Sequence, residues 1–210
     1  GLVTAEQRRF VVPLLEGSET ALPDSAFAQF RMVEIADGPA GVALADRLAA
    51  AAPGLLIAVR LQLRPDSAKR ALELREAGIH IIHLCADYQG REFGAEQSGM
   101  GFQPMDPTGK LPVPQPRFIK EALREIHGQL VQRGMRDEIT LIASGGIALA
   151  EHMAKAVICG ADLVGVDLPL LVALGCRVCQ AGHGSDCPAR IPECDVAYAA
   201  QRMVNLMGAW

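Results

Sequence analysis

The chain has 210 residues, of which 50% are hydrophobic and 21% are charged. This length and composition predict one soluble globular domain with a sizeable core, and they exclude a disordered chain. The formal net charge of -4 gives no electrostatic reason to expect a nucleic acid or an anionic membrane as a partner. Asp, Arg or Pro interrupts every apolar run before the roughly 20 residues that span a bilayer, so no membrane segment is predicted.

The cysteines indicate the compartment. Six are present, and four of them fall between Cys176 and Cys194. A secreted disulfide framework is usually smaller and spreads its cysteines along the chain, whereas clustering in a chain of this size favours a reduced compartment and metal binding. Residues 1–10 lack a signal-peptide pattern. We therefore expect a cytoplasmic protein.

Short apolar runs alternate with helical patterns in chain order. Such runs predict buried strands, and the segments between them predict amphipathic helices. Strands that are buried on both faces and alternate with helices indicate right-handed βαβ units in a parallel sheet. The strands are expected at 30–35, 54–63, 79–84, 138–143 and 162–166, and the helices at 42–51, 66–76, 116–133 and 148–159.

The number of strands leaves two architectures open. About five are visible, while a closed α/β barrel needs eight. The chain is therefore either an open, doubly wound sheet or the later part of a barrel whose first strands lie elsewhere. The long irregular stretch at 85–115 follows the end of a strand, which is where a barrel carries its active-site loops.

The first motif is a strand that ends in Ser144-Gly145-Gly146 and leads into a helix. Glycines let the backbone approach a ligand closely, and the N–H groups at a helix N-terminus attract an anion. The next strand places Gly165 at the equivalent point, and paired loops of this kind hold phosphate in many barrels. The pattern favours a phosphate site; the alternative is that the glycines only make tight turns.

The second motif contains Cys176 and Cys179 at C-x-x-C spacing, followed by Cys187-Pro188. This spacing lets two thiolates reach one metal centre, and Cys-Pro is common at iron–sulfur ligands. The motif favours an iron–sulfur cluster. Zinc is the chemical rival, with His183 or Cys194 as the fourth ligand. A disulfide or a set of buried cysteines is the remaining alternative.

Other polar residues give weaker signals. Arg60 lies in an apolar strand, where a cation needs a partner or an anionic ligand, so a functional role is favoured. Asp37, Asp87 and Tyr88 follow strand ends and are site candidates. Two histidines, His80 and His83, are three residues apart on a strand and so point to opposite faces; core positions are expected for both. Structural roles are expected for Cys85 and Cys159.

These motifs, in this order, resemble the FMN-binding domain of the glutamate synthase family, especially its archaeal-type and methylamine-related branches. The resemblance is strong from about Leu55 to the end of the chain. Its most specific part runs from Arg136 to Cys179. The segments that carry it are HIIHL (80–84), GMRDEITLIASGGI (134–147), GAD (160–162), LVALGC (171–176) with Cys179, and QRMVNLMGAW (201–210).

The resemblance implies a partial barrel that contains the fourth to the eighth strand, with FMN at its C-terminal mouth and a 3Fe-4S or 4Fe-4S cluster beside it. It places Ser144, Gly145, Gly146 and Gly165 around the FMN phosphate. It makes Cys176, Cys179 and Cys187 cluster ligands, with Cys194 completing the set, and it puts Arg60 where the family has a lysine near the flavin. The implied reaction reduces 2-iminoglutarate, formed from 2-oxoglutarate and ammonia, with electrons from ferredoxin or a reductase subunit.

The resemblance also divides the chain into a partial barrel at 1–175 and a cysteine-rich segment with a C-terminal helix at 176–210. The missing first strands would come from a partner subunit or from an N-terminal part. Asp167 stands where the family has a small hydroxyl residue or glycine beside the phosphate. That carboxylate would repel a phosphate. The alternative function is therefore a non-catalytic paralogue that serves as a structural or electron-relay subunit of a larger complex.

Overall fold

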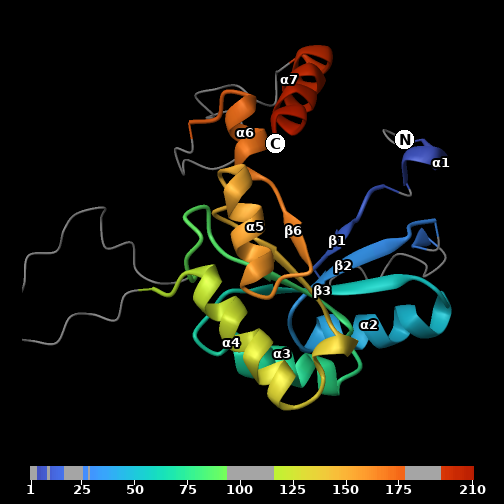
Figure 1. Cartoon of the computed structure of the whole chain (residues 1–210). Coiled ribbons are helices and arrows are strands. Elements are labelled where there is room, and N and C mark those ends of the chain that lie inside the picture. Colours follow the sequence, from blue (N-terminus) through green and yellow to red (C-terminus); the bar gives the residue numbers. More distant parts are fainter. Residues whose placement is uncertain (1–3, 9, 17–25, 28, 94–115, 178–194) are drawn as a thin grey trace, which may run out of the picture.

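The computed structural model describes residues 4–8, 10–16, 26, 27, 29–93, 116–177 and 195–210 (Figure 1). In these residues six strands form one sheet, and every neighbouring pair of strands is parallel. Their order in the sheet is their order in the chain, as expected for successive right-handed βαβ units. The strands are β1 (Leu14–Leu15), β2 (Met32–Ala36), β3 (Leu56–Gln62), β4 (Ile81–Cys85), β5 (Thr140–Ser144) and β6 (Leu163–Gly165).

Helices connect the strands from β2 onward, and further helices stand near the two ends of the described chain. Figure 1 shows α2, α3 and α4 together on one side of the sheet. The helices are α1 (Ala5–Arg8), α2 (Pro39–Ala51), α3 (Ser67–Glu76), α4 (Ile119–Gln132), α5 (Ala150–Ile158), α6 (Leu168–Ala173) and α7 (Val196–Ala209), with a short 3₁₀ helix at Arg136–Glu138.

Helix α4 shows how the sequence forms a helix that packs on the sheet. Its buried apolar residues recur three or four positions apart, which puts them on one face. At its start Glu121 accepts a hydrogen bond from the backbone N–H of Phe118, and after its end Gly134 takes a positive φ of 67°. The buried residues are Ile119, Ala122, Leu123, Ile126 and Leu130.

The sheet has two chemically different faces because successive side chains of a strand point in opposite directions. One face is fully apolar and packs against helices; Leu84 and Leu141, for example, are 0% exposed. We call this the helix-covered face. The other face carries polar residues at alternate positions of the same strands, and we call it the inner face. The inner-face residues considered below are Glu34, Arg60, His83, Cys85, Ser144 and Gly165.

The predicted α/β class with a parallel sheet is confirmed, and all five predicted strands are present. The sequence prediction missed β1, because two residues are too few to produce a recognisable pattern. It also missed α6, which is only six residues long. The described residues include no helix that is long and apolar enough to cross a membrane. The proposed division at residue 175 stays a prediction, since residues 178–194 lie outside the described part.

Candidate functional site

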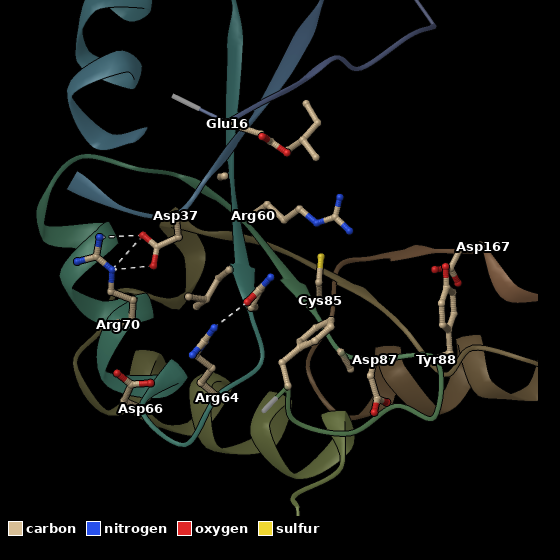
Figure 2. A pocket seen from close by; sticks show the side chains of 16 residues that line it. Glu16, Asp37, Arg60, Arg64, Asp66, Arg70, Cys85, Asp87, Tyr88 and Asp167 are labelled. Atoms are coloured by element: carbon tan, nitrogen blue, oxygen red, sulfur yellow. Dashed lines mark hydrogen bonds and ion pairs between the residues drawn. The ribbon is translucent and has the colours of Figure 1, made fainter. Parts of the chain in front are cut away.

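The carboxyl ends of parallel strands meet at one edge of the sheet, and a cavity of about 700 Å³ lies at this edge (Figure 2). Cavities of this size hold small molecules and cofactors. All four polar candidates that follow or end strands in the sequence line it: Arg60 from β3, Asp37 after β2, and Asp87 and Tyr88 after β4. The structure thus brings these four residues together at one cavity, and their functional roles stay predictions.

Two of the cavity's carboxylates already have partners. Asp37 accepts hydrogen bonds from Arg70 of α3, with Nη2 at 2.8 Å and Nε at 3.1 Å. These hydrogen bonds hold the pKa of Arg70 above its ordinary value. Asp87 accepts the backbone N–H groups of Gln89 and Arg91, each at 2.8 Å, and so closes the turn after β4. Both carboxylates therefore support the cavity wall.

Arg60 is different. Its side chain extends into the cavity toward Cys85 (Figure 2). Among the residues that the structure describes, no side chain makes a hydrogen bond or an ion pair with its guanidinium. An unpaired guanidinium in a cavity is a binding site for an anion, and its planar fork suits a carboxylate or a phosphate.

Asp167 faces the cavity from the start of α6. Its carboxylate accepts a hydrogen bond from the backbone N–H of Leu168 at 2.6 Å. The carboxylate therefore occupies the N-terminus of α6, which is where a bound phosphate would otherwise meet free N–H groups.

Gly145 and Gly146 have positive φ values of 95° and 70°, and their backbone is in close contact with the turn after β4. A Cβ atom at Gly145 would lie 2.3 Å from the carbonyl oxygen of Ala86. One at Gly146 would lie 2.5 Å from the Cα atom of Gly90. The two glycines are thus required by the packing of these two loops, whatever ligand binds nearby.

The other two residues predicted at the phosphate, Ser144 and Gly165, lie next to each other on the inner face. The Ser144 hydroxyl is 2.8 Å from Nε2 of His83 and 3.4 Å from Sγ of Cys85. A Cβ atom at Gly165 would lie 3.0 Å from the Cβ of Ser144 and 3.6 Å from Nε2 of His83. Gly165 therefore gives the Ser144–His83 pair room on the neighbouring strand.

His83 is the centre of this inner-face group. Its Nδ1 contacts a carboxylate oxygen of Glu34, and the two side chains are 16% and 13% exposed. Burial by itself would lower the pKa of His83, but hydrogen bonds with Cys85 and Glu34 outweigh it and raise the pKa to about 9. At neutral pH His83 is therefore a partly buried imidazolium paired with Glu34.

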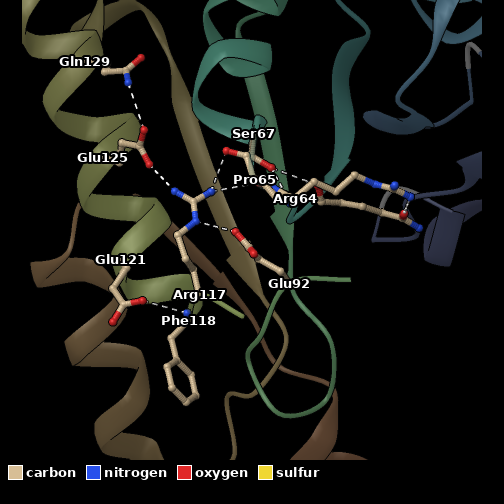
Figure 3. A network of polar contacts seen from close by, with 10 residues as sticks. Arg64, Pro65, Ser67, Glu92, Arg117, Phe118, Glu121, Glu125 and Gln129 are labelled. Carbon is tan, nitrogen blue, oxygen red and sulfur yellow. Dashed lines mark hydrogen bonds and ion pairs between the residues drawn. The ribbon is translucent and has the colours of Figure 1, made fainter. Parts of the chain in front are cut away.

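A second polar network holds the two ends of the segment 94–115 together beside the cavity (Figure 3). Arg117 forms ion pairs with Glu92 and Glu125, and its Nη2 donates to the carbonyl oxygens of Arg64 and Pro65 at 3.1 and 3.0 Å. Residues 91 and 118 also form an antiparallel bridge. The chain thus leaves and re-enters the described structure at one point near the cavity.

The predicted metal ligands fall mostly outside the described residues. Cys176 follows the end of α6, and its N–H donates to the carbonyl of Leu171 at 2.9 Å. Cys179, Cys187 and Cys194 lie outside the described residues. The iron–sulfur site therefore stays a prediction, as does its zinc alternative.

Sequence reasoning missed the pairing of Glu34 with His83. It expected core positions for His80 and His83, but His80 is exposed and His83 is partly buried on the inner face, and it assigned no role to Glu34. A signal was available: Glu34 is the one acidic residue in the apolar run FRMVEI, and His83 has the same alternation on its own strand. Their contact across β3 requires the register of three strands, which the sequence does not display.

Comparisons with known proteins add the family. Residues 115–206 match the model described as the conserved region in glutamate synthase. An archaeal glutamate synthase [NADPH] from Methanocaldococcus jannaschii is 36% identical over 100 residues, which are 44% of this chain and 20% of that protein. A ferredoxin-dependent glutamate synthase from Cyanidium caldarium is 24% identical over 133 residues, which are 62% of this chain and 8% of that protein.

A solved structure supports the fold. A mutant flavocytochrome b2 with benzoylformate superposes with a TM-score of 0.52 and 16% sequence identity, over 83% of this chain and 45% of that one. At this identity the likeness concerns the fold alone. The family model, in contrast, matches the sequence itself over α4, β5, α5, β6, α6 and most of α7. We conclude that the chain contains a glutamate synthase-family region, which the family model spans from residue 115 to residue 206.

Proposed function

We propose that this chain is part of a flavin-containing oxidoreductase related to glutamate synthase, and that the cavity at the carboxyl edge of the sheet holds the reactive part of an FMN. The proposal rests on where the family region and the cavity lie. Strands β5 and β6, which belong to the family region, end at the edge of the sheet where Arg60 projects into a cavity of about 700 Å³.

The residues fit a flavin on two counts. The cavity has the volume of a cofactor site. Arg60 supplies a guanidinium without a side-chain partner among the described residues, and it could face the anionic edge of a reduced flavin or a substrate carboxylate. The flavocytochrome that shares the fold is a flavoprotein by its name, which agrees with this use of the edge.

The phosphate end fits α5 better than α6. No side chain caps the first turn of α5. The N–H of His152 donates to the carbonyl of Leu149, which leaves the N–H groups of Ala150 and Glu151 for an anion. At α6 the carboxylate of Asp167 already accepts the N–H of Leu168. We therefore assign the phosphate to the Ser144–Ala150 segment and the α5 N-terminus, with Asp167 as a repulsive neighbour.

The chain's own residues would bind, orient and shield the reactants. A bound FMN would supply hydride transfer to an imine such as 2-iminoglutarate. Arg60 would hold the carboxylate of that substrate by a bidentate contact. The Asp87 turn and the Arg117 network fix the loops that border the cavity, which keeps the distance between the bound partners constant.

The cysteine segment would bring electrons to this site. Cys176 with Cys179 and Cys187, and with Cys194 as the fourth ligand, would hold an iron–sulfur cluster beyond the end of α6. The C-x-x-C spacing and the match of the family model across this segment support the assignment. Ferredoxin or a reductase subunit would be the electron donor; the related proteins are named for NADPH and for ferredoxin.

A complete barrel would need further strands beside the six described ones. We propose that a partner subunit or a further part of the same polypeptide supplies them. Molecular mass in solution tests the first option: a stable, monodisperse monomer that binds FMN would contradict the need for a partner subunit.

The test of the flavin proposal starts with anaerobic purification, followed by measurement of flavin and iron per chain and by titration with FMN. We expect a yellow or yellow-brown protein that binds FMN. In Arg60→Gln the affinity for FMN or for 2-oxoglutarate should fall roughly tenfold, because a charge-assisted hydrogen bond contributes about 1.5 kcal/mol. A colourless protein that binds neither FMN nor iron would overturn both cofactor proposals.

The repulsion by Asp167 is tested separately with Asp167→Thr. Threonine can still cap α6, so the fold should be retained. Removing the carboxylate should raise the affinity for FMN about tenfold, which corresponds to about 1.4 kcal/mol of lost repulsion. Asp137→Thr, at the opposite edge of the sheet, is the matched control and should leave the affinity unchanged. Equal affinities in all three proteins would remove the repulsion argument.

The second candidate function, a non-catalytic electron-relay or structural subunit, is favoured by one observation, the Asp167 carboxylate on the N-terminus of α6. It predicts iron without flavin. Cys176→Ala should then abolish the iron signal, while Cys159→Ala, whose side chain belongs to the described core, should retain it. Iron retained in Cys176→Ala would contradict the assigned ligands.

A further inference from the structure

The inner face carries a series of four hydrogen-bonded side chains that have no role in the flavin proposal. It starts at Glu34 on β2, passes through His83 on β4 and Ser144 on β5, and ends at Cys85 on β4. Cys85 is 2% exposed, and its residue forms part of the cavity wall. One end of this hydrogen-bonded series is thus a partly buried ion pair, and the other end meets the space where a ligand would bind.

The direction of the hydrogen bonds is the same throughout. A protonated His83 donates Nδ1–H to Glu34 and Nε2–H to the Ser144 hydroxyl, and the hydroxyl donates its own proton toward Sγ of Cys85. Each of these donors has one acceptor. Such an arrangement lets a proton move from His83 to Cys85 through one hydroxyl.

The same residues also have the composition of a metal site, because ligand atoms of Glu34, His83 and Cys85 all lie within 4.8 Å of one another. The hydrogen bonds argue against this use. Nδ1 of His83 faces Glu34 and Nε2 faces Ser144, so both ring nitrogens are already engaged. A proton relay uses the geometry as it stands, whereas a metal ion would require the group to rearrange.

We propose that Glu34, His83, Ser144 and Cys85 form a proton relay, and that Cys85 is the group at its end that exchanges a proton with a ligand in the cavity. The use of the relay in imine reduction rests on the proposed function. There the thiol gives its proton to the nitrogen while hydride reaches the carbon. Cys85 then takes the proton of Ser144, Ser144 takes that of His83 Nε2, and His83 regains one from solvent.

The charges around His83 suit this role. Glu34 of β2 holds Nδ1–H, and Arg60 of β3 is the register partner of His83 on the same face. Ser144 of β5 and Cys85 of β4 contribute no fixed charge of their own, and β6 contributes Gly165, which has no side chain. Glu34 is thus the one carboxylate that contacts the imidazolium among the described residues. The free guanidinium of Arg60 would hold an anionic ligand next to Cys85.

The experiment measures alkylation of each cysteine in the reduced full chain by iodoacetamide between pH 6 and pH 10, with site-resolved mass spectrometry. If His83 exchanges protons with Cys85, the pH profile of Cys85 depends on the imidazole. We expect His83→Gln to shift the midpoint of that profile and to change the alkylation rate of Cys85 at pH 7 about tenfold. Ser144→Ala should shift the midpoint in the same direction. The profile of Cys159 should not change.

A purely structural role for His83 would alter the Cys85 rate by one factor at every pH and leave the midpoint in place. That outcome would overturn the relay. His83→Lys, which keeps a positive charge but lacks an imidazole, should also shift the midpoint; an unshifted profile would equally overturn it. Circular dichroism of each variant confirms that it is folded, and Ser144→Ala, which removes a single oxygen atom, serves where His83→Gln does not fold.

Ligand access is tested with 2-oxoglutarate as the probe. It should slow the alkylation of Cys85 several-fold. Arg60→Gln should abolish this protection, while Arg124→Gln, at an exposed position of α4 outside the cavity, should keep it. Absence of protection in the wild type would overturn the assignment of Cys85 to the cavity. Neither measurement requires flavin. A chain that shows the relay and protection without binding FMN would therefore contradict the proposed function alone.

Discussion

The helix-covered face and the inner face are built from the same strands, yet their chemistry is opposite. On β5, for example, Leu141 is 0% exposed and belongs to the hydrophobic core. The adjacent Ile142 is half-buried and points to the inner face, as does Ser144 two residues later. On β4 the pair Ile82 and Leu84 faces helices, and His83 with Cys85 faces the other way.

The comparison shows how stability and chemistry are separated in this sheet. The helix-covered face is filled by apolar side chains that exclude water and supply the driving force for folding. The inner face holds a partly buried ion pair and a cavity, and it can do so because the opposite face is already packed. Substitutions on the two faces should therefore have different consequences.

The largest expected effect comes from the helix-covered face. Leu141→Ala removes a fully buried side chain and should lower the free energy of unfolding by about 2–5 kcal/mol. Ile142→Ala, one position along the same strand, should cost about half as much or less because that side chain is only partly buried. Urea denaturation measures both. Equal losses would show that a second packed layer covers the inner face and that the two faces do not differ in packing.

The next effect is a pH dependence that belongs to the inner face. The pKa of His83 is about 9 in the folded chain and 6.5 in its ordinary state, so the folded chain binds more protons between these values. The stabilisation from this raised pKa, to which the contacts with Cys85 and with Glu34 both contribute, is complete below pH 6.5 and is lost as the pH rises through about 9. Its full size is on the order of 3 kcal/mol.

Denaturation of the wild type and of Glu34→Gln at pH 6.5 and at pH 9.5 measures how much the contact between Glu34 and His83 contributes to this pH dependence. The wild type should lose more stability than Glu34→Gln as the pH rises. His80→Gln is the control, since its exposed ring contacts the carbonyl oxygen of Glu138 on the other side of the strand and should leave the wild-type slope unchanged. Parallel slopes for the wild type and Glu34→Gln would show that Glu34 does not set the protonation of His83.

The smallest expected effect comes from adding a single Cβ atom at Gly165 on the inner face. Gly165→Ala would place a Cβ 3.0 Å from that of Ser144, so the neighbouring strands must separate slightly. We expect a loss of about 1 kcal/mol, measured by urea denaturation. Gly128→Ala in α4 meets no atom within 4 Å and should instead stabilise by about 0.5–1 kcal/mol. A neutral Gly165→Ala would mean that the inner face has spare room at His83.

Much of the fold was predictable because its signals are local. The five longer strands follow from short apolar runs, and the helices follow from periodicity. Asp37, Asp87 and Tyr88 are site candidates in the sequence because they follow strand ends, and Arg60 is one because a cation in an apolar strand needs a partner or an anionic ligand. The two-residue strand β1 has no local signal, because its pairing with β2 alone makes it a strand.

The sequence by itself determined the alternation of strands and helices, the parallel α/β class and the family resemblance that is most specific from Arg136 to Cys179, because each depends on residues that are close together in the chain. The tertiary structure alone decided that Glu34 meets His83 across an intervening strand, and that Asp167 caps α6. It also decided that the glycines at 145 and 146 accommodate another loop. These contacts depend on register and on the approach of distant segments, which only packing of the whole sheet determines.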